Sequence, residues 1–257
     1  MIKDMSFAEQ SALFAKLSNQ AYKEFATVEK LYKKLGFTTT AYFANDGSNV
    51  YVTQNETDIV VVCRGTEVKE WNDISADLSI ALYPARIGDG KVHRGFRTYS
   101  DRVWDLVANE ITNSPDKTLW LTGHSLGAAM ATLMARRCLL QEHLPSPEAL
   151  FTYGSPRTGN RKYVNQFNEN IIHHRWINDG DIVTKIPLPI RFHHCGVMHH
   201  IDSKGNITVD YKHKLSLSRL LKLFSLKDIL DLLMGDVQDH SSELYVKHLS
   251  YWAENEI

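Results

Sequence analysis

The sequence has few of the residues that mark several classes of protein. Its 257 residues include three cysteines, Cys63, Cys138 and Cys195, whose odd number and wide spacing argue against a disulfide framework and a cysteine metal site. The net charge of -1 comes from interspersed positive and negative side chains, so no basic stripe for nucleic acid is present. We therefore expect no nucleic-acid partner and a reducing, cytoplasmic location.

Long apolar runs and linkers are also missing. No stretch approaches the roughly 18 apolar residues of a transmembrane segment, and the first residues carry charges in place of the apolar core of a signal peptide. No Pro-, Gly- or Ser-rich linker and no internal repeat divides the chain. Because 43% of the residues are hydrophobic, the sequence predicts one soluble domain over residues 1–257, with signal-independent export left open.

The hydrophobic pattern predicts an alternation of strands and helices. Strands are expected at 37–43, 49–54, 58–63, 118–122, 149–153 and 171–177, and a strand pair at 191–202 and 207–210. Helices are expected at 6–22, 28–35, 95–112, after residue 125, near 161 and at 241–252. This order is typical of an α/β protein with a largely parallel central sheet.

The most informative segment is residues 118–127, Thr-Leu-Trp-Leu-Thr-Gly-His-Ser-Leu-Gly. A β-rich run enters a Gly-x-Ser-x-Gly turn, and an alanine-rich helical run leaves it. The pentapeptide alone also arises by chance, but a strand before it and a helix after it are typical of the nucleophile elbow of an α/β-hydrolase. The glycines, Gly123 and Gly127, leave room for close backbone approach. The sequence therefore predicts that Ser125 is a nucleophile on a strained turn.

A nucleophilic serine needs a carboxylate and a histidine base, which follow it in that order in α/β-hydrolases. Asp179 and Asp181 come directly after the predicted strand 171–177, and the residues alone do not decide between them, since either could serve only the turn. An oxyanion also needs backbone N–H donors. Leu126, which follows the nucleophile, and Thr66, after the strand 58–63, are the candidates, although Thr66 could equally be a strand terminator.

His240 is the preferred base among twelve histidines. It precedes the predicted helix 241–252, so we expect an exposed ring on a loop tip. His124 is expected to pack within the elbow, and His248 to face solvent or a neighbour. Adjacent residues on a strand point to opposite faces, so the remaining candidates cannot form one base. These are His193, His194, His199 and His200.

Several segments together follow a known pattern. They are Gly-His-Ser-Leu-Gly at 123–127, Cys-Arg-Gly-Thr at 63–66, 92–96, 153–160, Asn178-x-x-Asp181-x-Val183, and Asp239-His240 with Tyr245. Together they resemble the class 3 lipases, a fungal-type family of α/β-hydrolases, over about residues 58 to 250. Cys63 departs from the usual Phe, and Thr184 stands where the family often has Pro.

The resemblance implies hydrolysis of lipid esters through an acyl-enzyme, with no cofactor and no metal. It favours Asp181 over Asp179, and implies that Ser125, Asp181 and His240 act with N–H donors at Thr66 and Leu126. It also implies a lid at 67–84, where an ordinary surface helix is the alternative. A transient contact with a lipid interface is expected from this lid.

The leucine-rich segment 214–234 carries more apolar residues than one core-facing stripe requires, which indicates either a cap over an acyl groove or two packed helices. The substrate stays open between triacylglycerols, phospholipids cleaved by a phospholipase A1, and feruloyl-type esters. Two alternatives of other classes are a catalytically inactive lipid-binding protein and a metal hydrolase built on the four histidines at 193, 194, 199 and 200.

Overall fold

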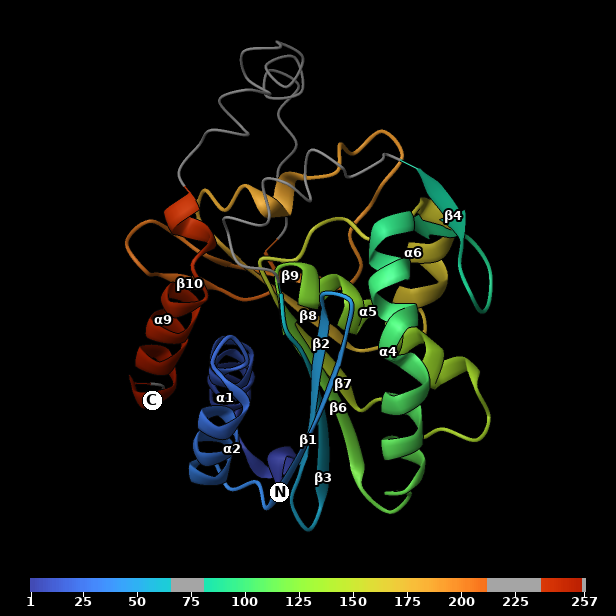
Figure 1. Ribbon diagram of the computed structural model, residues 1–257. Coiled ribbons are helices and arrows are strands. Elements are labelled where there is room, and N and C mark those ends of the chain that lie inside the picture. The colour runs from blue at the N-terminus through green and yellow to red at the C-terminus, as the bar shows by residue number, and fades with distance from the viewer. Residues whose placement is uncertain (66–80, 212–236, 256–257) are drawn as a thin grey trace.

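The computed structural model describes residues 1–65, 81–211 and 237–255 (Figure 1). Its centre is an eight-stranded sheet in the order β1-β2-β3-β6-β7-β8-β9-β10. The pairings from β3 to β9 are parallel, and those of β1·β2, β2·β3 and β9·β10 are antiparallel. The strands are β1 Thr39–Asn45, β2 Ser48–Gln54, β3 Asp58–Cys63, β6 Thr118–His124, β7 Ala149–Tyr153, β8 His173–Asn178, β9 Val197–Ile201 and β10 Ile207–Thr208. The predicted α/β-hydrolase fold with a mostly parallel sheet is confirmed.

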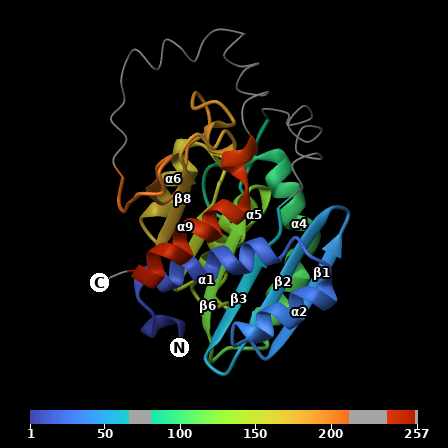
Figure 2. The ribbon, with the colours of Figure 1, turned by 90° about the vertical axis from the view of Figure 1, so that its left-hand side faces the viewer.

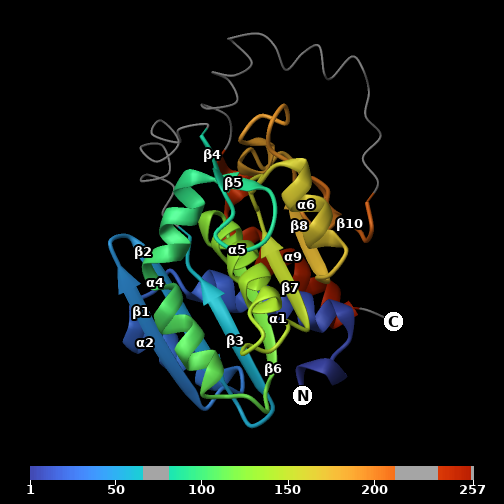
Figure 3. The same cartoon turned by 90° about the vertical axis from the view of Figure 1, so that its right-hand side faces the viewer.

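Two layers of helices cover the sheet. In Figure 2 one face carries α1 (Phe7–Gln20), α2 (Phe25–Lys34) and α9 (Ser242–Asn255). In Figure 3 the other carries α4 (Arg94–Thr112), α5 (Leu126–Leu140) and α6 (Arg161–Asn168). A small ribbon, β4 (Leu82–Pro84) with β5 (Lys91–His93), precedes α4. Short 3-10 turns complete the described elements: η1 Ile2–Asp4, η2 Val183–Lys185 and η3 Val237–His240.

Strand β3 shows why the sheet lies at the centre. All six of its residues are buried, and successive side chains alternate between two apolar clusters. Val60 and Val62 join the cluster with α1, α2 and α9, while Val61 faces α4 and α5. A strand that is apolar on both faces requires cover on both sides. The sequence of β3 thus accounts for the two helical layers.

Several predicted boundaries differ from the structure, and two of the differences have a visible local reason. Helix α2 begins at Phe25 rather than at residue 28, because the Phe25 ring stacks on Tyr42 at 5.7 Å and anchors an earlier first turn. Strand β9 begins at Val197 rather than at 191, since Gly196, with φ of +79°, interrupts the extended chain. Helix α9 continues to Asn255, beyond the predicted 252.

The described residues also bear on other expectations. Cys63, Cys138 and Cys195 are buried free thiols. Within 1–65, 81–211 and 237–255, no helix combines the length and apolarity needed to cross a bilayer. Of the predicted lid 67–84 only residues 81–84 are described, and the leucine-rich segment 214–234 and Thr66 lie outside the described residues.

Candidate active site

Ser125 lies on a strained turn between β6 and α5. Its φ of 59° and ψ of -128° are outside the regions that residues with a side chain ordinarily adopt. The turn can form because the residues two positions before and after Ser125 are glycines. A Cβ on Gly123 would lie 2.5 Å from the carbonyl carbon of Gly127, and a Cβ on Gly127 would overlap the carbonyl oxygen of Cys63. The Ser125 hydroxyl is buried and has no hydrogen-bond partner among the described residues.

Asp181 and His240 form a buried pair. His240 Nδ1 lies 3.0 Å from each carboxylate oxygen of Asp181. The Tyr245 hydroxyl donates to Asp181 Oδ2 at 2.6 Å, and the Val183 N–H donates to Oδ1 at 2.9 Å. Burial acts to raise the pKa of Asp181, but His240 and the Tyr245 hydrogen bond outweigh it and hold the pKa below its ordinary value. Asp181 is therefore an ionised acceptor, and the proton of a neutral His240 ring lies on Nδ1, which leaves Nε2 as the basic atom.

Gly154, at the end of β7, brings this pair to the elbow. Its φ is +58°, and a Cβ there would lie 2.7 Å from Asp181 Oδ2 and 2.8 Å from His240 Cε1. The residue before it, Tyr153, accepts the Ser125 N–H at 3.0 Å on its backbone oxygen. One turn thus contacts all three predicted residues, Ser125, Asp181 and His240, and only glycine leaves room for them. Gly154 lies in the segment 153–160 that resembles the family, but the sequence alone does not reveal this role.

The first turn of α5 and the end of β3 lie against the nucleophile. Leu126 is the first residue of α5, where a backbone N–H has no partner within the helix. A Cβ on Gly65 would lie 3.1 Å from Ser125 Cβ, so the chain leading to Thr66 passes beside the elbow. The start of α5 thus leaves the Leu126 N–H without a partner in the helix, and the roles of Leu126 and Thr66 as oxyanion donors both stay predictions.

The expected exposure of His240 was wrong. The residue is only 3% exposed, and it ends the 3-10 turn η3 instead of lying on a loop tip. The ring is enclosed because His124 stacks on it at 4.5 Å and Asp181 and Gly154 contact its other sides. Asp179, the alternative acid, is exposed, and its N–H bonds to the Ile201 carbonyl.

Hydrogen bonds that the sequence does not reveal join η3 to the loop 178–181, which carries Asp181. Asn178 Nδ2 donates to the Asp239 carbonyl oxygen at 3.0 Å, and the Gly180 N–H donates to Asp239 Oδ2 at 3.2 Å. These residues are 59 to 61 positions apart, so no local pattern reveals their contact. They fix the approach of the short turn that ends at His240.

Three of the other histidines, His199, His194 and His248, have structural neighbours away from Ser125. His199 lies 3.0 Å from His174 Nδ1, and His194 Nε2 donates to the Thr184 carbonyl at 2.7 Å. His248 lies beside Gly205, where a Cβ would approach His248 Nδ1 to 2.6 Å. Across the described part of the chain, no group of His, Cys, Asp or Glu could hold a metal ion.

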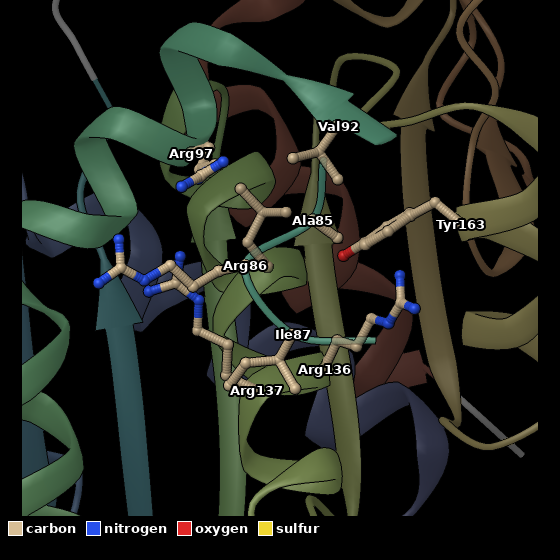
Figure 4. A pocket seen from close by; sticks show the side chains of 9 residues that line it. Ala85, Arg86, Ile87, Val92, Arg97, Arg136, Arg137 and Tyr163 are labelled. Atoms are coloured by element: carbon tan, nitrogen blue, oxygen red, sulfur yellow. The ribbon is translucent and has the colours of Figure 1, made fainter. Parts of the chain in front are cut away.

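Two cavities lie on the α4 and α5 side of the sheet, and neither is lined by Ser125, Asp181 or His240. Figure 4 shows the first, about 10 Å³ in volume, which has room for about one water molecule. The second measures about 250 Å³. Arginine side chains dominate their walls: Arg86, Arg97, Arg136 and Arg137. The first is too small to be a substrate site, and the second lacks any of the three predicted catalytic groups.

The sequence model of the family described as Lipase (class 3) matches residues 60–190, which include Ser125 and Asp181. The chain belongs to the class 3 lipase family. It is 32% identical over 191 residues to a lipase of Rhizomucor miehei, covering 70% of this chain and 50% of that protein. It is also 32% identical over 195 residues to the secreted mono- and diacylglycerol lipase A of Penicillium camembertii, covering 72% and 59%. Toxin TseL of Vibrio cholerae is 36% identical over 115 residues, covering 44% and 18%.

Solved structures of lipases share the fold. The triacylglyceride lipase of Rhizomucor miehei superposes with a TM-score of 0.73 at 21% identity, covering 90% of this chain and 92% of that one. A lipase of Rhizopus microsporus var. chinensis gives a TM-score of 0.69 at 22% identity, covering 91% and 85%. By contrast, the chain spans only 50% of the curated Rhizomucor miehei lipase, 59% of the Penicillium camembertii lipase and 18% of toxin TseL.

Proposed function

We propose that this protein is a serine hydrolase that cleaves carboxylic esters of lipids through an acyl-enzyme. The observation that carries the proposal is the meeting of the strained Ser125 turn with His240 and the buried Asp181 around Gly154. A nucleophile, a base and an acid that orients the base are the groups that acyl transfer needs. None of these steps uses a cofactor or a metal.

The proposed reaction has two halves. His240 Nε2 takes the Ser125 proton as Oγ attacks the ester carbonyl, and the oxyanion accepts N–H bonds from Leu126 and Thr66. His240 then gives the proton to the departing alcohol, which leaves an acyl-Ser125 ester. Water, deprotonated by His240, attacks this ester, and the fatty acid and free Ser125 result. Asp181 stays ionised throughout and stabilises the imidazolium, consistent with its lowered pKa.

The substrate class is supported by the relatives, whose names include lipase and mono- and diacylglycerol lipase. We propose acylglycerols as substrates, with phospholipids cleaved as by a phospholipase A1, or feruloyl-type esters, as the alternatives. Assays of an emulsified triacylglycerol, a phospholipid and an aryl ester, side by side, distinguish them. A catalytically inactive lipid-binding protein would hydrolyse none of the three.

Ser125→Ala tests the nucleophile in the same assays. The variant should lose ester hydrolysis and keep its melting temperature, since the hydroxyl has no partner among the described residues. Ser100→Ala is a matched control, because the Ser100 hydroxyl is also buried and has no partner in the described parts of the chain, but Ser100 lies in α4. Full turnover by purified Ser125→Ala would overturn the assignment.

Access to the site carries a further part of the proposal. Ser125 and His240 are 0% and 3% exposed, so an ester reaches them only after part of the chain moves. We propose that transient contact with a lipid interface drives this movement through burial of apolar surface. Rates for a chain-length series of esters should then rise above the solubility limit of each ester. A smooth saturation curve through that limit would contradict the interfacial step.

A cytoplasmic location is also a proposal, supported by three cysteines that are all buried free thiols. Fractionation of the source cells with an antibody to the chain tests it.

A further inference from the structure

Tyr22 connects the end of α1 to the site through the residue that precedes Ser125. The Tyr22 hydroxyl lies 2.8 Å from His124 Nδ1, and His124 Nε2 lies 2.8 Å from the backbone carbonyl oxygen of His240. The rings of His124 and His240 also stack, with centroids 4.5 Å apart and an interplanar angle of 29°. Residues 22, 124 and 240, from three separate parts of the chain, thus form one continuous set of contacts.

These hydrogen bonds determine which nitrogen of His124 carries the proton. A carbonyl oxygen only accepts, so Nε2 must donate to His240. In a neutral ring Nδ1 is then the acceptor, and the Tyr22 hydroxyl donates to it. Burial, and then the neighbouring His240, lower the pKa of His124 to about 3, so the ring is neutral near neutral pH.

A neutral His124 suits the proposed chemistry. His240 becomes a cation when it accepts the Ser125 proton, and a second cation stacked 4.5 Å away would oppose that step. The hydroxyl of Tyr22 occupies the Nδ1 lone pair and so favours the uncharged ring. The Nε2–H of the same ring holds the backbone of the base.

The end of α1 contacts two further parts of the site. A Cβ on Gly65 would overlap the Tyr22 hydroxyl, so this hydroxyl packs against the chain that leads to the predicted oxyanion donor. Asn19 Oδ1 accepts a hydrogen bond of 2.8 Å from the Ser242 hydroxyl, at the start of α9. The end of α1 is therefore connected to His240 through His124 and to the start of α9 through Ser242.

We infer that Tyr22 is a positioning residue, which holds His124 in its Nε2–H form and thereby fixes the backbone of His240 beside Ser125. The inference rests on the proposed function, because the placement of His240 matters to the rate only if His240 is the base. Tyr22 acts in this role through His124 and takes no part in proton transfer.

Tyr22→Phe removes the hydroxyl and keeps the ring. With a soluble ester, kcat should fall roughly ten- to hundred-fold, because small displacements of a catalytic group cost that much, while KM stays within about two-fold. Tyr32→Phe is the matched control. Its hydroxyl is buried and donates to the Leu17 carbonyl at 2.8 Å, so it loses a comparable bond away from the site. Tyr32→Phe should lower the melting temperature and leave kcat unchanged.

A second variant links the effect to His124. In His124→Gln the side-chain N–H can still donate to the His240 carbonyl without help from Tyr22. Adding Tyr22→Phe to this variant should therefore reduce kcat no further, so the two substitutions are not additive. Full additivity would mean that Tyr22 acts independently of His124.

Nuclear magnetic resonance of ¹⁵N-labelled histidines gives a readout that needs no enzyme activity. The wild-type His124 signal, assigned by its loss in His124→Gln, should show a neutral ring with the proton on Nε2 from about pH 5 to pH 8. Tyr22→Phe should admit the Nδ1–H or the doubly protonated form. An unchanged His124 signal, or a kcat equal to that of Tyr32→Phe, overturns the inference. A different result would overturn the proposed function: wild-type protein that hydrolyses no ester and whose Ser125 does not react with a fluorophosphonate. The positioning role of Tyr22 would then fail as well, even if His124 carries its proton on Nε2 as expected.

Discussion

Replacing Gly154 with alanine tests the packing that brings the acid and base to the elbow. The added Cβ would lie 2.7 Å from Asp181 Oδ2 and 2.8 Å from His240 Cε1. Ordinary contacts need about 3.5 Å, so the pair must move by roughly 0.7 Å. Moving catalytic groups by a distance of that order lowers the rate by about 100-fold. We therefore expect kcat for a soluble ester to fall by about that factor in Gly154→Ala.

Backbone strain must be separated from this displacement, because the Gly154 φ of +58° disfavours alanine by itself. Gly36 provides the control: its φ is +93°, and a Cβ there would meet nothing within 4 Å. Gly36→Ala should lose about 1 kcal/mol of unfolding free energy from strain alone and keep full activity. Both variants are compared by thermal unfolding and by ester hydrolysis. If Gly154→Ala loses no more activity than Gly36→Ala, the contact with Asp181 and His240 is not what requires glycine.

Two further predictions concern stability. Asp58, at the end of β3 away from the elbow, is buried and accepts hydrogen bonds from the Ile2 N–H, Trp120 Nε1 and the Thr57 hydroxyl. Asp58→Asn should therefore lower the free energy of unfolding, measured in urea, by about 2 kcal/mol and leave kcat unchanged. An unchanged unfolding midpoint would show that these bonds add little. Burial lowers the pKa of His174 to about 4 and that of His199 to about 3, whereas both titrate near 6.5 when unfolded. Below pH 6.5 the unfolded chain binds more protons than the folded one, so this contribution to stability is complete above pH 6.5 and is lost as the pH falls. The loss continues to about pH 4 for His174 and about pH 3 for His199, by at most about 1.4 kcal/mol per pH unit for each histidine before solvent screening. His199→Asn should flatten this slope, and an identical slope in wild type and variant would contradict it.

Local patterns predicted the elements that depend on neighbours in the sequence. The elbow strand and helix, β3 and β7 have the expected places, because a two-residue alternation, a glycine turn and an alanine-rich helix are written in consecutive residues. Helix α1 begins at Phe7, one residue after the predicted start, because Ser6 is its N-cap and its side chain accepts the Glu9 N–H in a capping box. That residues 1–257 form one domain stays a prediction.

Contacts between distant segments could not be predicted in the same way. The burial of His240 depends on the His124 ring, 116 residues earlier, and that of Asp181 depends on Tyr245, 64 residues later. Exposure near a helix start is the ordinary expectation for histidine, and only tertiary packing reverses it. The burial of His240 and its contact with His124 therefore required the structure, whereas the position of Ser125 on the elbow did not.

The reactivity of Ser125 is the most direct measure of the proposed function. A fluorophosphonate forms a covalent bond with a serine hydroxyl only where a base activates it. Mass spectrometry of the labelled wild-type protein should find one adduct, on the peptide that contains Ser125, and labelling should be abolished in Ser125→Ala and greatly slowed in His240→Ala. Wild-type protein that stays unlabelled, or an adduct that forms equally fast without His240, would contradict the assignment of Ser125 and His240 as nucleophile and base.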